Sequence, residues 1–374
     1  MLTDTAITNN DVDGGAGTAN PGNGGGLHIS GATMTTINNG IVTGNSAMRE
    51  GGGLWNQTGS TMMLNEVTVD SNIASGPDAI HGGGGIFNNG GDLTVTRSTV
   101  SNNTSAGAMA NGGGIHVKSG TVMLMVSTVS GNISTADGGG IYNNAGLTIN
   151  ASTIANNTAT INGGGVSNNA AIPVNIKNTI VALNNAAAGE DFYSSTSNFT
   201  SAGYNLIGQD DANVFSATAT DIEGANPLIG PLSDNGGETL THPLLEGSPA
   251  YNAGDPADMF NDQTGSPVFA GIRDIGAVEA QSQLAINSVT FGSRHTVIYP
   301  NPSADGLFNI AIGNVNTINV NCKVIELATG KTIMQITINN ELNIVRLPNF
   351  SSGVYIVQLV SDDFTETHKL VISK

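Results

Sequence analysis

The chain has 374 residues, of which 51 are glycine, and only 11% of its side chains are charged. Its 29 acidic and 11 basic residues give a net charge of −18 at pH 7, which disfavours nucleic acid and other polyanions as partners. No segment approaches the roughly 20 apolar residues that a membrane-spanning helix needs, so we expect no transmembrane segment.

A sequence unit returns six times before residue 190. Each copy opens with a glycine triplet and an aliphatic residue, and continues with a quartet of three inward positions and an Asn. The quartets are Thr35/Ile37/Val42/Asn45, Met62/Leu64/Val69/Asn72, Leu93/Val95/Val100/Asn103, Val122/Leu124/Val129/Asn132, Leu147/Ile149/Ile154/Asn157 and Val174/Ile176/Val181/Asn184. The period varies from 25 to 32 residues while the spacing within each quartet is fixed, which indicates one unit stacked on copies of itself.

The unit is typical of short β-strands. Apolar residues alternate with Thr or Asn, as in Leu93 and Val95, and helix-favouring residues are scarce. One coil of about three strands cannot bury its own apolar face, so residues 1–190 predict a right-handed parallel β-helix. We expect the recurring Asn to occupy one left-handed corner and to hydrogen-bond from coil to coil, and the glycine triplets to mark a second corner. Ile7 and Asn10 already fit the end of a quartet, so we expect the first coil to be incomplete.

Two columns of this β-helix should point away from its core. The residue after each aliphatic position gives five rings in succession, at His28, Trp55, Phe87, His116 and Tyr142. On coils about 4.8 Å apart these rings could form a platform for sugars, or could only stabilise one another. The second column reads Thr36, Met63, Thr94, Met123, Thr148 and Asn175, and its methionines argue against an ice-binding face.

Charged residues in the coils give little sign of catalysis. The only cations before residue 190 are Arg49, Arg97, Lys118 and Lys177, whereas polysaccharide-cleaving β-helices need a group of carboxylates or bases on their strands. Glu66 and Arg97 fall in one column of adjacent coils, which predicts an ion pair between them. The six histidines show no metal-ligand spacing.

Residues 191–280 carry 13 acids and 1 base. Their prolines break strand pairing, so we predict an acidic segment that caps the end of the β-helix. Asp255, Asp258 and Asp262 could hold Ca²⁺ through their oxygens, although their spacing is not that of an EF-hand and solvated loop acids are the alternative. No other cofactor is expected. Residues 281–294 are the predicted linker.

Residues 295–374 predict a small antiparallel β-sandwich. Alternating apolar residues mark strands from Ile318 to Val324, Ile333 to Ile338 and Val354 to Val360. The single cysteine, Cys322, lies in the first of these strands and is expected to be a core residue. Four short motifs occur in order, and their principal residues are Tyr299, Pro300, Asn301, Pro302 and Gly306, then Gly330 and Lys331, then Gly353 and Tyr355, and finally Lys369 and Lys374.

Three resemblances follow from these motifs. The glycine-triplet and Asn repeats resemble bacterial surface β-helix proteins, including the polymorphic outer-membrane protein family. Residues 226–279 resemble the closing segment of surface β-helix proteins that carry interchangeable C-terminal anchors. Residues 295–374 resemble the C-terminal sorting domain of type IX secretion substrates of Gram-negative bacteria. That resemblance implies recognition by the outer-membrane translocon and sorting machinery, after passage through the periplasm.

Together these features predict an exported protein that is attached to the cell surface or released. The favoured function is adhesion or the binding of surface, host or environmental glycans. A polysaccharide-active lyase or hydrolase, with its catalytic residues upstream or within 191–280, is the alternative from another class. A passive surface stalk is the third.

Overall fold

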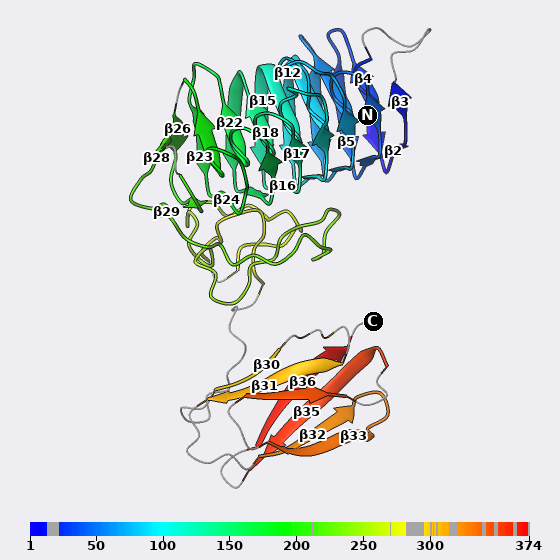
Figure 1. Ribbon diagram of the computed structural model, residues 1–374, viewed down its shortest axis with the longest axis vertical. Helices are drawn as coiled ribbons and strands as arrows, with labels where there is room; N and C mark the ends of the chain where they lie inside the picture. The colour runs from blue at the N-terminus through cyan, green and yellow to red at the C-terminus, as the bar shows by residue number, and fades with distance from the viewer. Residues whose placement is uncertain are drawn as a thin grey trace. The chain divides into compact units, whose positions relative to one another are not determined.

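A computed structural model gives the structure, which divides into two units, Met1–Leu284 and Ala285–Lys374. The first is a parallel β-helix of about 7 turns and the second consists of antiparallel sheets, so the predicted all-β fold is confirmed (Figure 1). The described residues are 1–12, 22–196, 198–210, 213–269, 271–281, 295–299, 301, 303, 306–313, 320–338, 342–347, 351–361 and 365–372.

Each full coil contributes to four parallel strand ladders rather than the three that we predicted. The first ladder follows the glycine triplets and contains β4 (Leu27–Ile29), β8 (Leu54–Gln57), β12 (Ile86–Thr96), β15 (Ile115–Met125), β18 (Ile141–Asn143), β22 (Val166–Asn168) and β25 (Phe192–Ser194). The second contains β1 (Leu2–Thr3), β5 (Met34–Asn38), β9 (Thr61–Asn65), the later parts of β12 and β15, β19 (Gly146–Asn150), β23 (Val174–Lys177), β26 (Phe199–Ser201) and β28 (Phe215–Ser216). The long strands β12 and β15 join these two ladders into one sheet.

The other two ladders form separate sheets. The third ladder contains β2 (Ala6–Thr8), β6 (Ile41–Thr43), β10 (Thr68–Asp70), β13 (Thr99–Ser101), β16 (Thr128–Ser130), β20 (Thr153–Ala155), β24 (Ile180–Ala182), β27 (Leu206–Ile207) and β29 (Ile222–Glu223). The fourth contains β3 (Asp11–Val12), β7 (Ser46–Ala47), β11 (Ile73–Ala74), β14 (Thr104–Ser105), β17 (Ile133–Ser134) and β21 (Thr158–Ala159). Because the register is unbroken from coil to coil within these two sheets, equivalent positions stack in columns.

The apolar positions of the quartets form the core. Leu64, Val95 and Leu124 are fully buried in one column, and Val69 and Val100 are buried in the next. Val69 pairs with Val100 and Val100 with Val129, so each side chain lies above its counterpart. Stacking therefore buries a continuous apolar column that no single coil could bury.

The recurring Asn residues form the predicted ladder of hydrogen bonds. Asn103 donates its backbone N–H (3.0 Å) and its Nδ2–H (2.9 Å) to Oδ1 of Asn132, and its Nδ2–H also reaches the carbonyl oxygen of Val69 (2.9 Å). The two donations to the next Asn repeat at Asn10, Asn45, Asn72, Asn132 and Asn157. The left-handed residue is not the ladder Asn, as we expected, but the residue before it, for example Asn102 (φ 54°).

Each of the three glycines in a triplet is required for a different structural reason. The first has positive φ, 66° at Gly112, which an L side chain adopts only with strain. A Cβ on Gly113 would lie 2.5 Å from the carbonyl oxygen of Gly139 in the next coil. A Cβ on Gly114 would lie 2.7 Å from the Gly140 carbonyl oxygen and 3.0 Å from the Asn132 carboxamide. The third glycine thus leaves the space that the Asn ladder occupies.

Residues 226–280, which we call the side segment, contain no strand or helix among their described residues. They pack along the third ladder rather than across the end of the stack, so this part of the capping prediction was wrong. The hydroxyl of Thr128 donates to Oε1 of Gln263 (2.7 Å), and the Ala277 N–H donates to the Thr153 hydroxyl (3.1 Å). At the end of the stack, the ring of Phe215 in β28 belongs to the apolar core and stacks on the ring of Phe192 at 5.5 Å.

The C-terminal unit has two antiparallel sheets around one core, as a sandwich requires (Figure 1). One sheet has the order β30-β31-β34 and the other β33-β32-β35-β36. Their strands are β30 (His295–Tyr299), β31 (Leu307–Gly313), β32 (Val320–Glu326), β33 (Thr332–Ile338), β34 (Leu342–Arg346), β35 (Gly353–Val360) and β36 (Thr365–Ile372). Cys322 is buried in this core as predicted, and burial raises the pKa of its thiol to about 11. Of the predicted linker, residues 282–294 lie outside the described residues.

The close approach at the glycine triplets gives a matched pair of substitutions. Gly114→Ala should lower the free energy of unfolding by about 1–3 kcal/mol, because its methyl group would overlap the next coil and the Asn ladder. Gly146→Ala, whose nearest contact would be an ordinary 3.4 Å, should be neutral or slightly stabilising. Urea denaturation of both variants measures this, and equal losses would contradict the packing described.

Candidate functional site

The column of rings is not an exposed platform, so of the two alternatives that the sequence left open the structure favours rings that stabilise one another. Trp55, Phe87, His116 and Tyr142 are each no more than 8% exposed, and only His28 is exposed. All five point away from the apolar core cluster, so the alternation was interpreted correctly. The error concerns exposure, because the turn before each ring folds back over it: a Cβ on Gly112 would touch that of His116 at 2.9 Å.

The rings pack on one another and on buried polar groups. The His28 and Trp55 rings stack at 4.1 Å, and those of Phe87 and His116 lie 4.6 Å apart. Trp55 Nε1 donates to Oε2 of Glu50 at 3.0 Å. Burial lowers the pKa of His116 to about 3, so its imidazole is neutral at pH 7. Loss of a buried Trp55 ring would cost roughly 3–5 kcal/mol, so this column stabilises the coils.

A polar column that we did not predict lies directly before the glycine triplets. Asn23 donates to the Glu50 carboxylate at 3.2 Å, and the Asn162 carboxamide donates to Oδ1 of Asp137 at 2.9 Å. Burial raises the pKa of Asp137. The signal was present in the sequence, since Asn23, Glu50, Asn111, Asp137 and Asn162 each precede a triplet.

The three aspartates considered for Ca²⁺ do not come together. Asp255 and Asp258 both contact Nζ of Lys177, at 2.7 and 2.9 Å, and this pairing holds the pKa of Asp255 below its usual range. Asp262 is buried elsewhere and accepts the backbone N–H groups of Ser266 and Glu279. Among the described residues no group of three or more His, Cys, Asp or Glu could hold a metal ion. The predicted ion pair of Arg97 and Glu66 is confirmed at 2.8 Å.

One pair has the geometry of a nucleophile and its base. Nε2 of His242 lies 2.8 Å from the Ser130 hydroxyl, and Nδ1 lies 2.8 Å from the carbonyl oxygen of Gly230. The carbonyl oxygen can only accept, so Nδ1 carries the proton and Nε2 accepts from Ser130. Both residues are at most 3% exposed and lie between the β-helix and the side segment, so no substrate reaches them. Their hydrogen bond instead holds the side segment against the β-helix.

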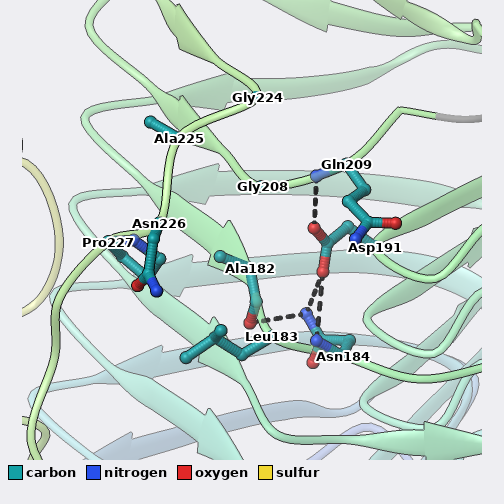
Figure 2. Close-up of a pocket in the computed structure, with 10 residues that line it drawn as sticks. All are labelled: Ala182, Leu183, Asn184, Asp191, Gly208, Gln209, Gly224, Ala225, Asn226 and Pro227. Atoms are coloured by element: carbon teal, nitrogen blue, oxygen red, sulfur yellow. Dashed lines mark hydrogen bonds between the residues drawn. The ribbon is translucent and has the colours of Figure 1, made fainter.

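The Asn ladder ends at Asp191. The seventh repeat reads Gly189-Glu190-Asp191-Phe192 where the earlier copies read GGG and an aliphatic residue, and Gly189 keeps the positive φ of 63°. Oδ1 of Asp191 accepts the backbone N–H (3.2 Å) and Nδ2–H (2.8 Å) of Asn184, as the next ladder Asn would. Its Oδ2 accepts the N–H of Gln209 at 2.7 Å (Figure 2).

A pocket of about 240 Å³ lies beside Asp191, where the chain leaves the last coils for the side segment. Its lining residues are Ala182, Leu183, Asn184, Asp191, Gly208, Gln209, Gly224, Ala225, Asn226 and Pro227 (Figure 2). Carboxamides, a carboxylate and backbone groups make most of this lining polar, and no cation lines it. Burial raises the pKa of Asp191 to about 6 despite its hydrogen bonds, so the carboxylate is mostly ionised at pH 7.

The motif residues of the C-terminal unit fix its chain ends and turns. Asn301 donates to the carbonyl oxygen of Lys369 (2.7 Å) and accepts the N–H of Val371 (2.8 Å), so it is hydrogen-bonded to the last strand. The buried Tyr355 hydroxyl donates to the Ser351 carbonyl oxygen at 2.9 Å. Gly330 has a φ of 69° in the turn before Lys331. Pro300, Pro302 and Lys374 lie outside the described residues, as does the side chain of Tyr299.

The two further motif glycines differ, since only Gly306 has a structural reason in the described part of this unit. Gly306 has a φ of 70°, and its carbonyl oxygen accepts the N–H of Leu347 at 3.0 Å. Gly353 begins β35 and is exposed. Lys369 is exposed on β36. The motif therefore combines residues that hold the fold with side chains that are accessible.

Comparison with known families assigns the C-terminal unit. Residues 297–373 match the secretion system C-terminal sorting domain. Comparison with curated proteins gives no match. The sorting domain indicates type IX export across the outer membrane to the cell surface or the extracellular space, and interaction with that secretion machinery. None of the described residues belongs to a helix that could cross a membrane.

The raised pKa of Asp191 predicts a pH-dependent stability. Because its folded pKa is about 6 against an ordinary 3.8, the folded protein binds more protons between these values, and stability falls as pH rises through this window. The free energy of unfolding of the native chain should therefore fall by up to about 3 kcal/mol relative to Asp191→Asn between pH 4 and pH 7. Denaturant titrations of both proteins across this range measure it. A difference that does not change with pH would contradict it.

Proposed function

We propose that this chain, exported through its sorting domain, acts at the cell surface as an adhesin that contacts neutral glycans through the outward face of its second ladder. The proposal joins two findings. The chain carries a type IX sorting domain. Its β-helix also presents a regular and almost uncharged face on a protein whose net charge is −18.

This face consists of outward side chains in register on successive coils. Thr36 pairs with Met63, and Thr94 pairs with Met123, which in turn pairs with Thr148. Each of these side chains is partly or fully exposed, and Met34 and Met123 are 73% and 44% exposed. Asp92 and Lys177 are the charged residues among the outward positions of the second ladder, which takes in β5, β9, the later parts of β12 and β15, β19 and β23.

Charge and side-chain chemistry both favour contact at this face. The acidic parts of this chain would be repelled by any anionic surface. A face without net charge can approach without that cost. Thr and Asn can bond to glycan hydroxyls, and flexible Met side chains adapt to irregular apolar surfaces. This observation carries the proposal.

A charge placed on the face tests the proposal. Beads coated with the purified full chain should bind films of neutral polysaccharide. Met123→Glu combined with Thr148→Glu should reduce bead retention at least fivefold, because two exposed carboxylates would have to be desolvated on contact. Ile133→Glu combined with Thr158→Glu adds two carboxylates to adjacent coils of the fourth ladder instead and is the matched control. Equal retention of the native and doubly substituted chains would refute the proposed face.

A further inference from the structure

The pocket beside Asp191 differs from every other corner of the same kind in one residue. The position before each ladder Asn has positive φ, and it is occupied by Asn9, Gly44, Ser71, Asn102, Gly131, Asn156 and Leu183. Glycine, asparagine and small polar residues tolerate this conformation, whereas a bulky leucine at φ 63° is strained. Backbone strain of this kind is frequently associated with functional sites.

The fold gives no reason for leucine at this corner. Its side chain does not enter the core, since Leu183 is 46% exposed and lines the pocket. In Figure 2 it lies between Asn226 and Pro227 on one side and Asn184 and Asp191 on the other. Leu183 therefore supplies an apolar surface to a pocket that is otherwise mostly polar.

The polar groups around Leu183 are suited to hydroxyls. Asp191 lines the pocket although it is only 1% exposed. Its Oδ1 accepts two N–H groups and its Oδ2 accepts one, and an ionised carboxylate can accept about four hydrogen bonds, so Oδ2 has capacity for one more donor. The exposed carboxamides of Gln209 and Asn226 offer both donors and acceptors at the same pocket. The absence of a cation from the lining, with an ionised carboxylate present, disfavours anionic ligands.

We propose that this pocket binds one neutral pyranose ring, either as a free sugar or as the terminal residue of a glycan. A pyranose combines hydroxyls with an apolar C–H face, which matches the carboxylate, the two carboxamides and Leu183. A volume of about 240 Å³ is smaller than that of typical drug-sized sites, and suits a single ring rather than an oligosaccharide. This site is separate from the adhesive face proposed above and does not depend on it.

Leu183→Asn is the decisive variant, because it restores the residue found at three equivalent corners. It should raise the denaturation midpoint by relieving strain, and at the same time weaken sugar binding at least tenfold by removing the apolar surface. Ser71→Asn makes the corresponding change at a corner of an earlier coil, far along the stack from the pocket, and should leave binding unchanged. Gln209→Ala, which keeps the backbone N–H to Asp191, should also weaken binding.

The experiment is a calorimetric titration of the full chain with glucose, galactose, mannose and N-acetylglucosamine, and with methylammonium as a cationic probe. A second arm uses immobilised glycans that end in the same sugars. Binding in the titration supports a free sugar, and binding in the second arm alone supports a glycan terminus. The proposal is overturned if no sugar binds in either arm, if only methylammonium binds, or if Leu183→Asn binds as tightly as the native chain.

Discussion

The interaction on which the β-helix depends is the line of buried carboxamides at its corners. A coil exposes its corner backbone to the next coil, and an unsatisfied buried N–H would cost about 1–3 kcal/mol. Each ladder Asn supplies the acceptor that its neighbour needs, because one Oδ1 accepts both the backbone and the side-chain N–H of the preceding Asn. Its own Nδ2 then satisfies a backbone carbonyl, as Asn132 does for Val100.

The hydrogen bonds of the Asn ladder all run the same way along the stack, and this direction explains how the ladder ends. Every ladder residue donates toward the next coil, so the last one needs a partner that only accepts. Asp191 is such a partner, and it occupies the third position of the altered glycine triplet, beside the place where a ladder Asn would otherwise lie. Because Asp191 brings a carboxylate to the point where the chain leaves the coils, the ladder's end and the pocket are one structural feature.

Sequence reasoning succeeded where residue type and spacing repeat. The inward quartets, the Asn column and the pair of Glu66 and Arg97 follow from period and alternation alone, and the structure confirms them. It failed where burial depends on variable turns, because alternation gives the direction of a ring such as Phe87 but not what folds over it. The side segment was also misplaced, since contacts such as Thr128 with Gln263 join residues 135 positions apart without any repeating pattern.

The most direct test of the ladder is an isosteric change of one donor. Asn132→Asp keeps the shape and the Oδ1 acceptor but replaces the Nδ2 donor by an oxygen that faces the Val100 carbonyl and Asn157. At pH 7 it should lower the free energy of unfolding by roughly 3–5 kcal/mol, whereas Asn10→Asp on the exposed first coil should cost less than about 1 kcal/mol. Equal losses in urea denaturation would show that the corner carboxamides do not hold the coils together.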